Sequence, residues 1–200
     1  MYFYFIYATI SVGEFETFLT QPNRRQKNKT TGENKKMKST SKSALYLTRG
    51  ALIAAMYVAL TYLAFLLGLS SGVIQFRISE ALCILPIFFP EAMLGLTIGC
   101  IISNLITGAV VWDIVFGSLA TLIGALGARI LRKLPDKFKF LATLPTTLAN
   151  AIIVPFVLLF AYGVEGGYWY FFLTVGLGEL VCATVGGTLL YFSLKKIRLS

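Results

Sequence analysis

Apolar stretches follow one another from Leu45 to the C-terminal end of the chain, separated only by short polar or glycine-rich interruptions. Several approach the ~20 residues that a helix needs to cross a bilayer, and apolar runs of that length favour helices over strands. The pattern predicts an all-α integral membrane protein with one membrane domain over residues 45–200. Its six helices are expected at about 45–68, 78–90, 91–108, 112–132, 138–163 and 168–195.

The composition supports this membrane assignment. The mean hydropathy is +0.75, and only 14% of the residues are charged, which is too few for a water-exposed surface. The basic residues behind the net charge of +9 collect in the N-terminal region, in segment 132–139 and near the C-terminus. Because lysine and arginine gather on the cytoplasmic side of membrane proteins, both termini are expected in the cytoplasm, and nucleic acid is not an expected partner.

The chain lacks the residues of many catalytic and metal sites. Histidine is absent, and the three cysteines lie far apart inside predicted spans. Zinc sites, disulfide frameworks and histidine-based catalysis are therefore not expected. No carboxylate, lysine or cysteine forms a convincing catalytic dyad at helical spacing. The sequence predicts a protein that is not an enzyme and that uses no metal or cofactor.

Residues 1–44 form a polar and basic N-terminal extension that is predicted to be disordered. Its opening segment MYFYFIYATISV is too short to span a membrane and lacks the basic start of a signal peptide. Met37 begins a segment typical of a cytoplasm-first membrane protein, and GENKK before it permits a purine-rich codon run resembling a ribosome-binding site. Residues 1–36 are therefore interpreted as translated leader, and a short interfacial anchor is the alternative.

Small residues recur every four positions in three of the predicted helices, a spacing that lets two helices approach closely. Such stripes usually serve internal packing, and this is the interpretation for the third and fourth helices. For the first helix, internal packing and a partner surface are both open at this point. The stripes are Ala51, Ala55 and Ala59 in the first helix, Gly95, Gly99 and Ser103 in the third, and Ala120, Gly124 and Ala128 in the fourth.

Two polar residues are predicted near the middle of the membrane. Glu179 lies in the last helix, on a face with small residues, and Asn150 lies at similar depth in the fifth helix. A carboxylate at this depth is costly unless it is paired, protonated or in contact with water. Two interpretations follow: an interhelical hydrogen bond between the two side chains, or a polar cavity.

Further polar and aromatic residues gather at the predicted outer surface. Arg77 and Glu80 are three residues apart, close enough on a helix to form an ion pair of small value. Aromatic residues at a membrane boundary are most often interfacial anchors. Their convergence with carboxylates and amides favours a binding site instead. The candidates are Arg77, Glu80, Asn104, Trp112, Asp113, Tyr168 and Trp169.

Four segments carry a family resemblance: QFRISEALCILPIFFPEAMLGLTIGCIISNL, WDIVFGSLATLIGAL, LANAIIVPF and VGLGEL. From about residue 45 to the C-terminus, the chain resembles the QueT-type queuosine-precursor transporters, which are substrate-binding S components of energy-coupling factor (ECF) uptake systems. The resemblance implies an S-component-like bundle in the bacterial cell membrane with an outward-facing pocket. It also implies a transmembrane coupling subunit (EcfT) and two ATPase subunits (EcfA and EcfA′) as partners. The chain has no phosphate-binding loop motif, so ATP hydrolysis falls to those partners.

The resemblance implies a 7-deazaguanine ligand such as preQ1, preQ0 or queuine. Its N1–H and exocyclic amine donate side by side, which suits the carboxylate of Glu179. The same comparison makes the first-helix stripe of Ala51, Ala55 and Ala59 an expected contact with the coupling subunit. Further expected roles are polar contacts from Asn150 and Asn104, an outer rim of Arg77, Glu80 and Asp113, and a stacking surface or lid of Trp112, Tyr168 or Trp169.

Other functions stay open at this point. The chain could be an S component for another vitamin or a purine-like micronutrient. A stand-alone secondary carrier is less favoured because the internal repeat usual in such carriers is not found. A polytopic membrane enzyme is less favoured because the sequence offers no convincing nucleophile and base.

Overall fold

The computed structural model describes residues 32–69 and 76–199, and all regular secondary structure in these two ranges is helical. The chain divides into two units: Tyr46–Tyr191 is the larger, and Met1–Leu45 with Phe192–Ser200 is the other. All contacts analysed below lie within Tyr46–Tyr191. The apolar opening segment and residues 1–31 of the predicted leader lie outside the described residues.

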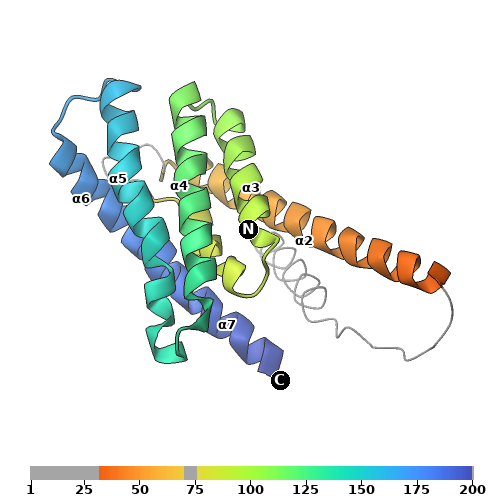
Figure 1. The fold of residues 1–200 in the computed structure, drawn as a ribbon. Helices are drawn as coiled ribbons and strands as arrows, with labels where there is room; N and C mark the ends of the chain where they lie inside the picture. The colour runs from red at the N-terminus through yellow and green to blue at the C-terminus, as the bar shows by residue number, and fades with distance from the viewer. Residues whose placement is uncertain (1–31, 70–75, 200) are drawn as a thin grey trace, which may run out of the picture. The chain divides into compact units, whose positions relative to one another are not determined.

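The helices follow one another with short connections (Figure 1). In chain order they are α2 (Gly32–Leu66), the 3₁₀ helix η1 (Ile78–Ile87), α3 (Ala92–Ile106), α4 (Val111–Ile130), the 3₁₀ helices η2 (Leu131–Lys133) and η3 (Asp136–Ala142), α5 (Leu144–Phe160), α6 (Tyr168–Glu179), the π-helix η4 (Leu180–Gly186) and α7 (Gly187–Leu199). Helix α4 packs between α3 and α5, and α5 also packs against α6.

Several helical segments are long and apolar enough to cross a membrane. In the part of the chain that the structure describes, these are Ser43–Leu66, Val111–Lys133, Asp136–Phe160 and Tyr168–Lys196. Helices η1 and α3 are also apolar, but with 10 and 15 residues they are shorter than the ~20 residues of an ordinary span. The prediction of an all-α, multi-pass membrane protein is confirmed.

Two predicted segments differ from the observed helices at their N-terminal ends. Helix α2 begins at Gly32 rather than near residue 45, so residues 32–44 belong to a helix in the structure. The fifth predicted helix, 138–163, is divided into η3 and α5. The division falls just before Pro145, which occupies the first turn of α5, where its missing N–H costs no helical hydrogen bond.

Two other predicted helices have unexpected geometry. The second, predicted as 78–90, is a 3₁₀ helix that ends at Ile87, directly after Pro86. Proline removes a backbone donor and restricts helix continuation, which accounts for the early end. The last predicted helix, 168–195, contains the π-helix η4. Hydrophobic patterning does not distinguish a 3₁₀ helix or a π-helix from an α-helix, because all three helix types present apolar residues to the same surroundings.

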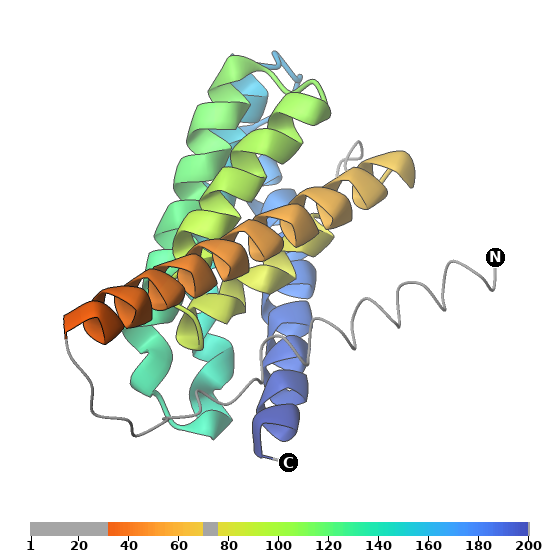
Figure 2. The same ribbon diagram turned by 90° about the vertical axis from the view of Figure 1, so that its right-hand side faces the viewer.

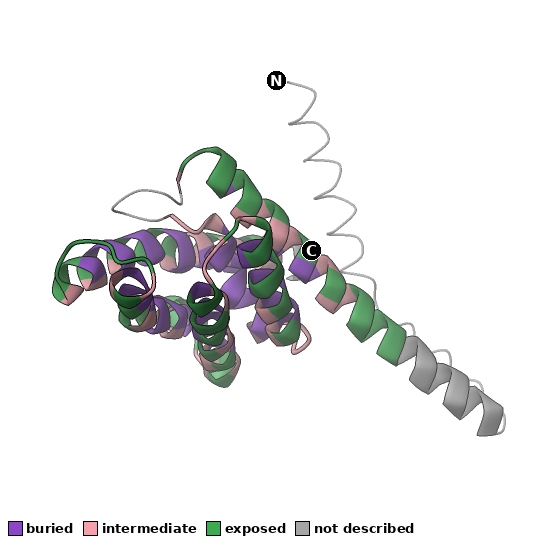
Figure 3. Cartoon of the chain, turned by 90° about the horizontal axis from the view of Figure 1, so that it is seen from above, coloured by how far each residue is buried: buried purple, intermediate pink, exposed green. Residues whose placement is uncertain are grey.

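The small-residue stripes of α3 and α4 are buried where helices meet. A Cβ atom placed on Gly95 would lie 2.5 Å from the backbone oxygen of Gly50, where α2 crosses α3 (Figure 2). A Cβ on Gly124 of α4 would overlap Thr146 of α5. Internal packing is thus confirmed for both stripes. Figure 3 shows the buried residues gathered where the helices meet.

We expect Gly95→Ala to destabilise the protein. The new Cβ would lie 2.5 Å from a backbone atom of Gly50, so one helix must shift. Overpacking of this kind costs about 1–3 kcal/mol, and the midpoint of thermal unfolding should fall by several degrees. Gly176→Ala is the matched control, because its Cβ would meet only the Cβ of Ala151 at an ordinary 3.6 Å. Equal melting temperatures for the two variants in detergent would contradict the close crossing.

Helix α2 has two different faces within the larger unit. Ile53, Tyr57 and Ala64 are buried. The residues of the predicted stripe, Ala51, Ala55 and Ala59, are exposed. This stripe therefore does not serve packing within Tyr46–Tyr191.

Candidate functional site

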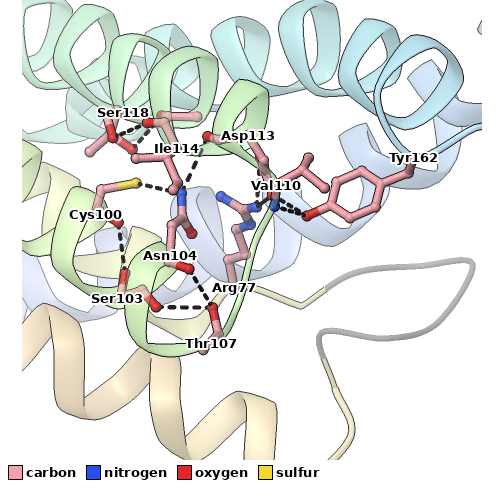
Figure 4. A network of polar contacts seen from close by, with 12 residues as sticks. Arg77, Cys100, Ser103, Asn104, Thr107, Val110, Asp113, Ile114, Ser118 and Tyr162 are labelled. Carbon is pink, nitrogen blue, oxygen red and sulfur yellow. Dashed lines mark hydrogen bonds and ion pairs between the residues drawn. The ribbon is translucent and has the colours of Figure 1, made fainter.

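Three separate segments meet at the carboxylate of Asp113 (Figure 4). The Nη2 atom of Arg77 lies 3.5 Å from each oxygen of this carboxylate. The hydroxyl of Tyr162, in the connection after α5, donates to Oδ2 of Asp113 at 3.1 Å. The backbone N–H of Val110 in turn donates to the Tyr162 oxygen at 3.3 Å. We call Arg77, Asn104, Asp113 and Tyr162 the Asp113 cluster.

Asn104 and Gly117 shape this cluster from α3 and α4. The amide of Asn104 donates to the backbone oxygen of Asp113 at 3.3 Å. A Cβ atom on Gly117 would lie 3.2 Å from Oδ1 of Asp113, 3.3 Å from the Asn104 amide nitrogen and 3.6 Å from Nη1 of Arg77. The glycine therefore leaves the space that the polar side chains occupy.

Tyr162 is partly shielded from water by its neighbours. Burial raises the pKa of its phenol above the ordinary value, and the negative charge of Asp113 raises it further. The hydroxyl is therefore protonated at physiological pH and stays the donor in its hydrogen bond to Asp113.

Glu80 lies in the first turn of η1 and is completely buried. Its carboxylate accepts hydrogen bonds from the hydroxyl of Tyr57, from the thiol of Cys83 at 3.0 Å and from the hydroxyl of Thr121 at 3.3 Å. These donors offset the cost of burying a carboxylate away from water. The side chain is thus held in one position by α2, η1 and α4.

The ion pair considered for Arg77 and Glu80 is not formed. Arg77 precedes η1, with a φ of −94° and a ψ of 84°, which is not helical geometry. A spacing of three residues therefore does not place the two side chains on one helix face. The guanidinium pairs with Asp113 instead.

Glu179 and Asn150 are buried at the interface of α6 and α5, with Glu179 only 2% exposed. The Glu179 carboxyl interacts with the side chain of Asn150 and with the charges of Glu80 and Arg77. The two side chains singled out from the sequence thus interact across the helix interface. Nevertheless, no described residue makes a hydrogen bond of good geometry to Oε2 of Glu179 or to either amide atom of Asn150. The pair leaves one donor and two acceptors without partners.

A π-helix follows Glu179 directly. The seven residues of η4 are π-helical, and such segments are rare and frequently mark functional sites. The π-helix packs against η1, where the Cβ of Ala81 would lie 3.2 Å from a Cβ on Gly186. Glu80 thus lies on an element that contacts the segment directly after Glu179.

The aromatic candidates lie on the exposed side of their helices. Trp112 is 60% exposed, stacks on Phe116 and lines an apolar groove of about 410 Å³ between α4 and α5. Trp169 is 73% exposed and packs edge-on against Tyr168, whose hydroxyl donates to the backbone oxygen of Ile152. The structure thus brings together the polar candidates but not these rings. A stacking role for them stays a prediction.

Three residues of the site are absent from the sequence prediction. Tyr57 and Thr121 donate to Glu80, and Tyr162 donates to Asp113. The sequence does contain a pattern that indicates Tyr57 as a site residue. Tyr57 and Thr61 carry hydroxyl groups four residues apart on the buried face of α2. For Tyr162, in a connection, periodicity offers no signal.

The charges of the site favour ligands that donate hydrogen bonds. Glu80, Asp113 and Glu179 are all buried. Arg77 supplies a positive charge beside them, and it is already paired with Asp113. Among the described residues, no group of three or more His, Cys, Asp or Glu side chains is arranged to hold a metal ion. Oε2 of Glu179 and Oδ1 of Asn150 are buried acceptors without a hydrogen-bond partner among the described residues.

Comparison with known proteins agrees with the family resemblance. A family model described as "QueT transporter" matches residues 47–196. A curated relative, the "Queuosine precursor transporter QueT" of Lactococcus lactis subsp. cremoris (strain MG1363), is 42% identical over 73 residues. This alignment covers 36% of the chain and 43% of the relative, so it spans less than half of that protein's length. No solved structure matches the chain.

The family match extends over most of the membrane domain and includes every residue of the site. It covers the Asp113 cluster, Glu80, Asn150 and Glu179, and also the exposed stripe of α2. The resemblance seen in the sequence is confirmed, and the family is one of transporters rather than enzymes. The chain belongs to the QueT transporter family.

Proposed function

We propose that the chain is the substrate-binding S component of an ECF uptake transporter and captures a queuosine precursor, a 7-deazaguanine, from outside the cell. The family match and the name of the L. lactis relative support this substrate class. The observation that carries the proposal is the buried pair of Glu179 and Asn150 with its unpartnered polar atoms. A buried polar group without a partner costs about 1–3 kcal/mol. A ligand that pairs with these atoms recovers that cost.

The hydrogen-bonding groups of a 7-deazaguanine complement this pair. Its N1–H and exocyclic amine present two adjacent donors, which the Glu179 carboxylate accepts. Its ring carbonyl oxygen accepts from the amide nitrogen of Asn150. The donors of the ligand thus face acceptors of the protein, and the acceptor of the ligand faces a donor of the protein.

The Asp113 cluster forms the outer rim of the proposed site. Arg77 and Asn104 are donors there, and Glu80 lies below them on η1. Trp112, Tyr168 or Trp169 closes over the ligand as a stacking surface, since a base stacked on an aromatic side chain gains about 1–3 kcal/mol. These rings are exposed or half-buried in the structure, so closure requires that they turn inward.

The proposed topology has six crossings of the bacterial cell membrane. Helices η1 and α3 form two short crossings between the longer ones, and an even number of crossings leaves both termini on one side. The basic segment 132–139 and the basic terminal regions support a cytoplasmic location of that side. The Asp113 cluster, at the opposite ends of α4 and α5, then faces outward.

The proposed partners are EcfT and the ATPases EcfA and EcfA′. Ala51, Ala55 and Ala59 support this assignment because they are exposed and leave room for a helix to approach closely. The energy of ATP hydrolysis reaches the chain through EcfT in this scheme.

The proposed function is tested by ligand screening. The full chain in nanodiscs is heated with 7-deazaguanines, purines and vitamins in turn. We expect a 7-deazaguanine to raise the unfolding midpoint, since a ligand at 100 times its Kd adds about 2.7 kcal/mol of stability. Stabilisation by a vitamin and by no 7-deazaguanine would contradict the proposed substrate.

A further inference from the structure

The π-helix η4 joins two segments that are each fixed to the rest of the larger unit. Before it, Phe171 and Val175 of α6 pack in a buried apolar cluster with α5. After it, Tyr191 of α7 is buried, and its hydroxyl donates to Oδ1 of Asp136 at 2.6 Å. Neither segment can turn about its axis without losing these contacts. The extra residue of the wide π-helical turn is therefore kept between them, but these contacts do not decide at which position.

One hydrogen bond ties the π-helix itself to α5. The hydroxyl oxygens of Thr184, in η4, and Thr147, in α5, lie 3.1 Å apart. Thr147 is three residues from Asn150, so the two side chains share the face of α5 that meets α6 and η4. The helix interface therefore has a second polar layer, about one turn from the layer that Glu179 forms.

The wide turn explains how Glu179 and Thr184 face the same neighbouring helix. They are five residues apart, and in an α-helix of 3.6 residues per turn such side chains point about 140° away from each other. A π-helix pairs residue i with residue i+5 and so returns the fifth residue to the same side. Glu179 is the last residue of α6 and directly precedes η4. The direction of its carboxylate therefore depends on where the wide turn lies.

We propose that Thr147 and Thr184 are positioning residues whose hydrogen bond fixes the place of the π-helical turn and so aims the Glu179 carboxylate at the ligand. Without this hydrogen bond the extra residue is free to shift along the helix, and Glu179 turns with the residues around it. The two threonines act through Glu179, because their hydroxyls are already bonded to each other. The inference rests on the proposed function, since it takes Glu179 as the group that binds the 7-deazaguanine.

The test compares two ligands that differ only in a group that Glu179 is proposed to recognise. They are 7-deazaguanine itself and 7-deazahypoxanthine, which lacks the exocyclic amine. Calorimetry on the full chain in nanodiscs gives the ratio of their affinities, which measures how well the carboxylate is aimed. We expect Thr184→Val, which keeps the shape of the side chain but removes the hydroxyl, to reduce this ratio roughly tenfold.

Three further variants separate aiming from general stability. Thr184→Ser keeps the hydroxyl and should retain the wild-type ratio. Adding Thr147→Val to Thr184→Val should reduce the ratio no further, because both changes remove the same hydrogen bond. Thr97→Val is the matched control and should also keep the wild-type ratio, since the Thr97 hydroxyl donates to the backbone oxygen of Met93 within α3.

Three results would overturn the inference. The first is a wild-type ratio in Thr184→Val, including the case in which both ligands bind equally more weakly, as a purely structural role would give. The second is a double variant whose loss is the product of the two single losses, and the third is a reduced ratio in Thr184→Ser. A wild type without preference for 7-deazaguanine contradicts the proposed role of Glu179 and this inference with it. A wild-type preference that Thr184→Val leaves unchanged contradicts the inference alone.

Discussion

Glu179→Gln is expected to weaken binding of a 7-deazaguanine by about two orders of magnitude. Hydrogen bonds to a charged group contribute about 1.5–3 kcal/mol, and every 1.4 kcal/mol is a factor of ten in affinity. Glutamine keeps the shape of the side chain but turns one acceptor into a donor, which then faces a donor of the ligand. The measurement is calorimetric titration of the full chain in nanodiscs.

Glu165→Gln is the matched control for this variant. It makes the same chemical change in the exposed connection between α5 and α6. We expect its affinity to equal that of the wild type, so that a loss in Glu179→Gln is not due to net charge. Equal affinity for Glu179→Gln and the wild type would show that the ligand binds elsewhere.

Ala55→Trp is expected to abolish association with EcfT, EcfA and EcfA′. Helices in a membrane associate through close packing of small residues, so a large side chain at the centre of the stripe keeps the two surfaces apart. Because Ala55 is exposed, the fold and the ligand affinity of the isolated chain should be unchanged. Co-purification of the three partners with a tagged chain measures the association.

Leu126→Trp controls for the bulk of the new side chain. Leu126 is 45% exposed on α4, outside the α2 stripe, and this variant should retain its partners. If Ala55→Trp co-purifies with the coupling subunit as well as Leu126→Trp does, the alanine stripe is not the docking surface.

The sequence predicts the features that depend on burial along one helix. Apolar runs locate the helices, and the depth of Glu179 and Asn150 marks them as a buried polar pair. Their burial is confirmed. A carboxylate that shares a helix face with small residues packs at the interface with a neighbouring helix. The close packing at the glycines of α3 is likewise predictable from the sequence, since close packing requires small residues at fixed spacing.

Contacts between distant segments are not predictable in the same way. Tyr57 donates to Glu80 across 23 residues of sequence, and no periodicity within α2 reveals which polar group it meets. Helical spacing predicts a pair of Arg77 with Glu80, yet the backbone of Arg77 is not helical. The choice of Asp113 as its partner depends on how η1 and α4 pack, which is a property of the assembled bundle.

The most direct test of the central claim is a structure of the chain with a bound 7-deazaguanine. We predict that the Glu179 carboxylate lies within hydrogen-bonding distance of N1–H and the exocyclic amine, with the Asn150 amide on the ring oxygen. A ligand seated elsewhere, for example in the apolar groove beside Trp112, with Glu179 and Asn150 still unpartnered, would contradict the account.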